Sequence, residues 1–257
     1  FKESKKVIYL DTTSTTYRYP YFREDDHNIT AWNPVLNQLN FIESPKPDDN
    51  FQIFSTKIVL QKDGSGQIYK NNIYSGSWEA GLREYLASLK DNEKRAIFGQ
   101  LASKEYPGSI LDSYAHSDPK DYKKPFELEF SFKAGEITKK SGRFLILSLP
   151  VRYNFSFVTF ETRSSPINLR TNYGDKNITE IVIPKELKVK SKLEDIEIKN
   201  SFFRYKASYK VENDKLTIES SFFRYKAYIP KEDYEEFRKA LFEVDKIVKR
   251  PIIFDGL

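Results

Sequence analysis

The sequence predicts a mainly β protein of the α+β class. We expect an antiparallel β-sandwich-like region with a helical insertion near 78–105 and a C-terminal helix. Aromatic residues make up 15% of the 257 residues, in alternating runs that suit strand faces better than helix stripes. Short strand-like runs follow one another between Gly, Pro and Asn signals, which is typical of a sandwich. The helical spacing of three and four residues appears only near 78–105 and at the C-terminal end.

The chain starts with a strand-like run over 7–11 that ends at Asp11. Residues 12–50 carry four prolines and few regular patterns, so we expect an edge loop and then a linker. This places 1–47 apart from a β-rich domain over 48–257. A further division is expected near 135–142.

The second region opens with a hairpin and two helices. Residues 52–61 and 67–74 are predicted strands, because Asp-Gly in the turn between them supplies the positive φ of a tight hairpin. Apolar residues then recur at helical spacing from Ser77 to Glu105, interrupted by Lys90-Asp91-Asn92. We expect Ser77 and Asp91 as N-caps and the Tyr-Pro-Gly after Glu105 as the stop.

Strand patterns return after the helices. Residues 126–132 alternate Phe or Leu with polar residues, which predicts a strand with one buried face and one solvent-exposed face. Further strands are expected at 143–149, 151–161, 178–183 and 186–190.

A heptapeptide, Ser-Phe-Phe-Arg-Tyr-Lys-Ala, occurs at 201–207 and again at 221–227. The two copies flank a two-residue turn at Asn213-Asp214, so they should pair as an antiparallel hairpin. In that register Phe203 faces Arg224 and Arg204 faces Phe223, which predicts two aromatic–guanidinium contacts.

The last predicted element is a helix over 231–248. Pro230 opens it and acidic residues favour its positive end. Its apolar stripe consists of Tyr234, Phe237, Leu241, Val244 and Val248.

Composition excludes several classes. The 42 basic and 37 acidic residues are interspersed, which indicates a solvated surface and not a nucleic-acid partner. With no Cys and two His, we predict no metal site and no cofactor, and Asp25-Asp26-His27 is interpreted as a solvated polar turn. No apolar run is long enough to predict a membrane-spanning helix.

Several short segments together resemble the C-terminal part of a bacterial transglutaminase-like protein, which joins an N-terminal β domain, a transglutaminase core and a C-terminal β domain. The segments are Tyr9-Leu10-Asp11-Thr12-Thr13, Gly81-Leu82-Arg83 with Leu86 and Leu89, Tyr106-Pro107-Gly108, Arg143-Phe144-Leu145 to Leu149-Pro150, Arg163-Ser164-Ser165-Pro166, and Ile229-Pro230-Lys231-Glu232-Asp233-Tyr234 with Arg238.

The resemblance implies a cysteine nucleophile and a histidine base upstream of Phe1. Asp11 would then be the carboxylate that orients the histidine. The chain would be a non-catalytic accessory β region, whose partners are the upstream core and a protein or peptide substrate. The parent would be a cysteine-dependent acyltransferase or protease, or an inactive relative, in a periplasmic or extracellular setting. Two other classes stay open: a binding module for envelope glycans or proteins, which exposed aromatic rings would favour, and a structural assembly domain, which a symmetric interface would favour.

Overall fold

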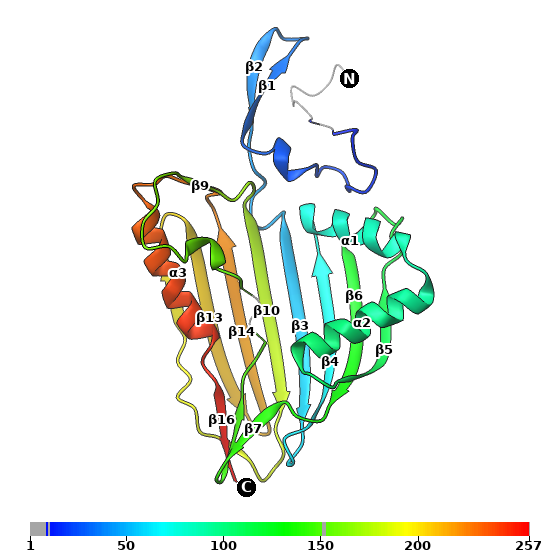
Figure 1. Cartoon of the computed structure of the whole chain (residues 1–257), viewed down its shortest axis with the longest axis vertical. Coiled ribbons are helices and arrows are strands. Elements are labelled where there is room, and N and C mark those ends of the chain that lie inside the picture. Colours follow the sequence, from blue (N-terminus) through cyan, green and yellow to red (C-terminus); the bar gives the residue numbers. More distant parts are fainter. Residues whose placement is uncertain (1–8, 10, 151–152, 257) are drawn as a thin grey trace.

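The computed structural model describes residues 9, 11–150 and 153–256. An eight-stranded mixed sheet forms the body of the protein (Figure 1). Its strands are β3 (Phe51–Leu60), β4 (Gly66–Tyr74), β5 (Ile110–His116), β6 (Phe126–Ala134), β10 (Tyr173–Val182), β12 (Ile196–Lys199), β13 (Phe203–Glu212) and β14 (Lys215–Arg224). Their order is β12-β13-β14-β10-β3-β4-β6-β5, and all neighbours are antiparallel except β3 and β10, which run parallel.

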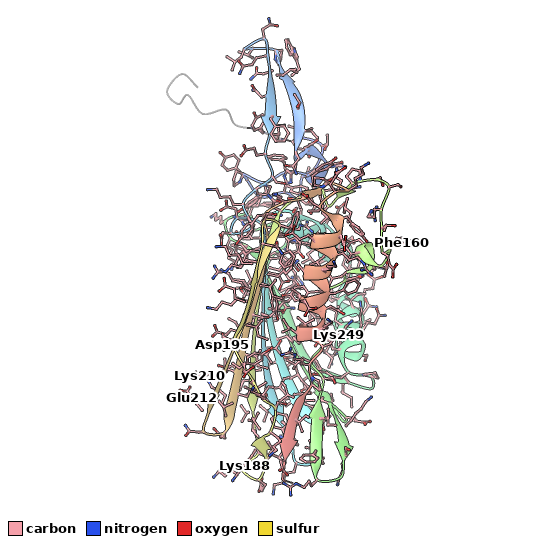
Figure 2. The ribbon with its side chains drawn as sticks, turned by 90° about the vertical axis from the view of Figure 1, so that its left-hand side faces the viewer. Phe160, Lys188, Asp195, Lys210, Glu212 and Lys249 are labelled. Atoms are coloured by element: carbon pink, nitrogen blue, oxygen red, sulfur yellow. The ribbon has the colours of Figure 1, made fainter. Side chains whose placement is uncertain are left out.

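One face of this sheet is covered. The helices α1 (Ser77–Ser88) and α2 (Asp91–Glu105) lie over β4, β5 and β6, and α3 (Tyr234–Val248) lies over β13 and β14 (Figure 1). The lower part carries a four-stranded sheet, β11-β16-β8-β7. Its strands are β7 (Thr138–Ser141), β8 (Phe144–Leu147), β11 (Lys188–Val189) and β16 (Ile252–Asp255). Figure 2 shows these elements on the same side of the large sheet. We call this side the covered face.

The core divides into two apolar clusters on the covered face. One cluster joins the large sheet to α1, α2 and the four-stranded sheet, and it includes Phe98, Phe132, Leu147 and Phe254. The other packs α3 against β13, β14 and the segment around Val158. The mainly β, α+β class predicted from the sequence is therefore confirmed.

The first predicted hairpin and both predicted helices are present. The predicted N-caps, Ser77 and Asp91, were wrong by one residue: Gly76 and Lys90 occupy the N-cap positions. The first turn of α1 is capped from elsewhere: Asn50 Oδ1 accepts hydrogen bonds from Ser77 N at 3.0 Å and from Ser77 Oγ at 2.9 Å. The positive φ of Gly76, 75°, allows the chain to turn into the helix beside the Asn50 side chain.

The region predicted as loop and linker differs most. It contains the 3-10 turn η1 (Glu24–Asp26) and a hairpin of β1 (Ile29–Asn33) and β2 (Gln38–Ile42). Of the turn-forming residues in this stretch, Pro34 and Asn37 lie in the hairpin turn, where Asn37 has a φ of 50°. The hairpin projects away from the large sheet (Figure 1).

The strand predicted over 151–161 was wrong where it can be judged. Residues 153–161 contain no strand but the 3-10 turn η2 (Ser156–Val158), while 151–152 lie outside the described residues. Aromatic residues here alternate because they fill the cluster under α3. The pattern missed β5, β7 and β12, and it missed the short pair β9 (Ile167–Asn168) and β15 (Tyr228–Ile229).

The heptapeptide hairpin has the predicted register. Phe203 lies opposite Arg224, Arg204 opposite Phe223, and Glu212 opposite Lys215 beside the turn. The predicted aromatic–guanidinium contacts were wrong in their partners. The guanidinium of Arg204 pairs with Glu197 at 2.9 Å, and that of Arg224 lies 4.5 Å from the ring centre of Tyr173.

The C-terminal helix is confirmed, with a later start at Tyr234. Tyr234, Phe237, Leu241 and Val244 are buried as predicted, whereas Val248 is half-buried and Ile247 takes the buried position instead. None of the helices in the described residues is long and apolar enough to cross a bilayer.

Candidate functional site

Asp11 was the only catalytic residue predicted from the sequence. Of the strand predicted over 7–11, the structure describes only Tyr9 and Asp11, and neither belongs to a strand. Residues 7, 8 and 10 lie outside the described part of the chain. Asp11 Oδ1 accepts hydrogen bonds from Thr13 N at 2.8 Å and from Thr13 Oγ1 at 2.6 Å. These bonds lower the pKa of the Asp11 carboxyl, so it is a carboxylate at neutral pH. Its role as an orienting carboxylate stays a prediction, because the sequence contains no cysteine for it to serve.

A buried ion pair between Arg18 and Glu79 connects the segment after Asp11 to α1. Arg18 Nε donates to Glu79 Oε1 at 2.7 Å, where the Glu79 side chain is fully buried and that of Arg18 is 15% exposed. Phe126 N donates to the other oxygen of Glu79 at 3.1 Å, and Arg83 lies 3.7 Å from the same oxygen. Burial raises the pKa of Glu79 despite these partners.

The chain that follows is attached near the upper end of the large sheet. His27 is buried, and its Nδ1 shares a hydrogen bond with Thr171 Oγ1 at 2.9 Å. The prediction of a solvated turn was therefore wrong for His27, whose burial lowers its pKa to about 4. Among the described residues, no three His, Cys, Asp or Glu residues are grouped to hold a metal ion.

A groove runs along the covered face between α2 and α3. It consists of an upper cavity of about 730 Å³ and a lower cavity of about 350 Å³, which share Glu105, Pro150 and Tyr153 in their walls. A third hollow of about 890 Å³ lies between α1 and residues 13–17, and it meets the upper cavity at Glu24 and Trp78. The three hollows are therefore neighbours, because each shares wall residues with the next.

Three hydrogen-bonded polar side chains, Tyr153, Asp175 and Asn177, lie in the wall of this groove. Asp175 is 5% exposed, and its Oδ1 accepts hydrogen bonds from Tyr153 OH at 3.3 Å and from Asn177 Nδ2. Asn177 Nδ2 also donates to Tyr153 OH at 3.1 Å. Burial, together with the Asp175 charge, raises the pKa of Tyr153 well above its usual range. Tyr153 is therefore a protonated hydrogen-bond donor at neutral pH, not a base.

Arg224 lines the upper cavity from β14. Its Nη2 donates to the carbonyl oxygens of Leu169 at 3.3 Å and of Thr171, and its guanidinium stacks on Tyr173. Burial lowers the pKa of Arg224 and raises that of Tyr173 to about 12. Its buried Nε has no hydrogen-bond partner within the described residues.

A buried ion pair lies in the wall of the lower cavity. Lys70 Nζ lies 2.6 Å from Glu105 Oε2, with the Lys70 side chain 1% exposed. Neither His27 nor His116 lines the upper or lower cavity. The groove thus presents rings, amides and paired charges, an arrangement suited to holding a ligand.

Sequence reasoning assigned none of the groove residues to a site. Arg224 was noticed only as part of the repeat, and Asp175 and Asn177 belong to β10, whose first half was not predicted. Alternation along 173–182 would have placed both polar residues on the face of Ile181.

Fold and site together define a mainly β, α+β protein with a groove between helices on one sheet face. Residues 142–254 match a family model named DUF3858, described as a domain of unknown function with a solved structure. No curated protein matches. A crystal structure of a candidate protease from Parabacteroides distasonis is similar to 44% of this chain at 14% identity, with a TM-score of 0.39. The similar part covers 23% of that protein.

Proposed function

We propose that this chain is the C-terminal accessory β region of a transglutaminase-like protein and has no catalytic activity by itself. The observation that carries the proposal is the buried pair of Arg18 and Glu79. A triad carboxylate must be held in a fixed position relative to its histidine, because a displacement of about 1 Å costs about 100-fold in rate. The ion pair fixes the segment that follows Asp11 on the rigid helical layer.

Further contacts support a fixed junction. Tyr122 OH donates to Thr15 O at 2.9 Å, and Arg18 Nη2 donates to Ser75 Oγ at 2.9 Å. A flexible linker would not need such bonds to two separate parts of the domain. The family match over 142–254 agrees with an accessory domain, and the parent activity we propose is acyl transfer or hydrolysis at peptide amides.

The first test uses the chain itself. Incubated with peptide amides and amine acceptors, it should show no turnover above buffer. Turnover that survives repurification would contradict the proposal, because the chain has no cysteine to act as nucleophile.

The second test uses the parent protein. Asp11→Asn should lower its kcat by at least about 100-fold, because the histidine loses the charge that stabilises its protonated form. Asp25→Asn is the matched control, since Asp25 is exposed and pairs with Arg23 on the same segment. Equal losses in both variants, or none in either, would refute the role of Asp11.

The groove favours a second candidate function, a binding module. Leu101 is 39% exposed and lines the upper cavity, so Leu101→Arg should block entry without disturbing the core. The probes are blocked aromatic tetrapeptides and N-acetylglucosamine tetramers, measured by titration calorimetry. Val35→Arg is the control, because Val35 is 89% exposed on the distant hairpin. Binding that Leu101→Arg abolishes and Val35→Arg preserves would assign a ligand to the groove. If neither probe binds, this second function is rejected.

A further inference from the structure

The hairpin of β1 and β2 exposes an unusual amount of apolar surface. Residues 28–42 contain no Asp, Glu, Lys or Arg, in a chain with 79 such residues from 42 basic and 37 acidic side chains. Large apolar side chains lie open along it: Ile29, Trp32, Val35, Leu36, Leu39 and Phe41. Contiguous surface of this kind normally marks an interaction site.

Three of these side chains form one face. In the hairpin register Trp32 lies opposite Leu39, and Thr30 lies opposite Phe41. Opposite residues share a face, and so do residues two apart along a strand, so Trp32, Leu39 and Phe41 stand together. Their exposed fractions are 56%, 67% and 58%. We call these three residues the hairpin face.

The base of the hairpin is held rigidly. Asn28 N donates to Ile42 O at 2.7 Å, and Asn28 Nδ2 donates to Arg170 O at 2.9 Å and Ser44 Oγ at 3.0 Å. Ile42 is buried beside these bonds. The hairpin therefore points away from the large sheet in a fixed direction (Figure 1), and its face is not covered by the described residues.

The size of the face indicates what kind of partner it suits. Strands of five residues are about 17 Å long, so the face is far smaller than the ~800 Å² that each partner of a stable free complex buries. A small apolar face suffices when the partner belongs to the same polypeptide, because a covalent connection raises its effective concentration. Residues 11–28 lead directly into β1, so a preceding domain would lie near the hairpin.

Charge disfavours a membrane as partner. The base of the hairpin has four carboxylates, Glu24, Asp25, Asp26 and Glu43, beside the cations Arg23 and Arg170, so it offers no excess of positive charge to attract an anionic lipid surface. We propose that the hairpin face docks against an apolar surface of the upstream core of the same polypeptide. This proposal rests on the proposed function, since it requires that core.

Hydroxyl-radical footprinting with mass spectrometry tests the docking residue by residue. The chain and the longer parent protein are oxidised in parallel. Trp32, Leu39 and Phe41 should react about fivefold or more slowly in the parent, because a docked face excludes solvent. Phe160 and Tyr228, 71% and 54% exposed elsewhere, are internal references that should react equally in both (Phe160 is labelled in Figure 2).

A variant measures the consequence. Trp32→Ser/Leu39→Ser/Phe41→Ser should increase tryptic cleavage between core and accessory region in the parent, while the melting temperature of the isolated chain stays unchanged. Phe160→Ser/Tyr228→Ser is the matched control and should leave both the tryptic cleavage of the parent and the melting temperature of the isolated chain unchanged.

Three results would overturn the proposal. Equal oxidation rates in chain and parent would leave the face uncovered although the core is present. Protection that rises with the concentration of the isolated chain would assign the face to a second copy. Protection by vesicles of phosphatidylcholine and phosphatidylglycerol would assign it to lipid. Catalytic activity of the isolated chain would instead contradict the proposed function, so the two failures are distinguishable.

Discussion

Arg18 Nε donates a hydrogen bond to Glu79 Oε1 at 2.7 Å, joining residues 61 positions apart in the sequence. The pair connects the N-terminal segment to α1 at a place where the carboxylate is fully buried. A buried charge is tolerated when it is paired and hydrogen-bonded, and here Arg18 supplies the closest cation.

Removing Arg18 should therefore destabilise the chain. Arg18→Ala leaves the Glu79 carboxylate with Arg83 at 3.7 Å and one backbone donor, and we expect a loss of about 2–4 kcal/mol in unfolding free energy. Arg23→Ala is the control, because both side chains of the Arg23–Asp25 pair are 47% exposed and solvent screens their attraction, so the loss should be much smaller. Urea denaturation measures both. Similar losses in the two variants would mean that the Arg18 pair is no more than a surface contact.

His27 should make stability depend on pH. Its pKa is lowered to about 4 in the fold from an ordinary 6.5, so the unfolded chain takes up the proton first. The contribution of neutral His27 to the unfolding free energy is therefore fully present above pH 6.5. The unfolding free energy should decline by about 1–2 kcal/mol as the pH falls toward 4. In His27→Gln this decline should be shallower between pH 6.5 and 4.5, as measured by melting curves. Parallel pH profiles for the two proteins would contradict the burial of a neutral imidazole.

The two arginines of the repeat should behave differently. Arg204 pairs with Glu197 at an exposed site, where both side chains are more than 40% accessible, so Arg204→Ala should cost less than about 1 kcal/mol. Arg224→Ala removes the donor to two backbone carbonyl oxygens and should cost about 2–4 kcal/mol. Chemical denaturation compares the variants directly. Equal costs would indicate that the buried hydrogen bonds of Arg224 are replaced by solvent.

The helix α3 should hold the second cluster together. Phe237 is 1% exposed and packs on Phe202 with a ring separation of 5.3 Å, so Phe237→Ala should cost about 3–5 kcal/mol. Phe242→Ala is the matched control on the half-buried side of the same helix and should cost about 1 kcal/mol. Thermal unfolding ranks the two variants. A larger loss for Phe242 would place the packing surface of the helix on its other side.

The sequence alone determined the local elements whose signals agree with one another. The Asp-Gly turn predicted its hairpin, and the alternation of 126–132 matches the side of β6 that the structure buries. The helical spacing of 77–105 predicted both helices but not their buried side, because Trp78 and Tyr85 are 38% and 44% exposed while Glu79 and Arg83 are buried. The repeat even specified its register, because a two-residue turn leaves a single way to pair the flanking strands. The stripe of α3 was predictable for the same reason, since a regular period of apolar residues identifies the buried side of a helix.

The tertiary structure decided which distant residues meet. Asp175 and Arg224 became groove residues because β10 lies between β3 and β14, and no local pattern encodes that order. Arg18 and Glu79 likewise meet only when the N-terminal segment folds back on α1. The β1–β2 hairpin was hidden from sequence reasoning because turn formers fill its tip and its apolar residues face solvent. Periodicity reveals burial against the chain itself, whereas long-range pairing and surfaces for other partners depend on the arrangement of elements in space.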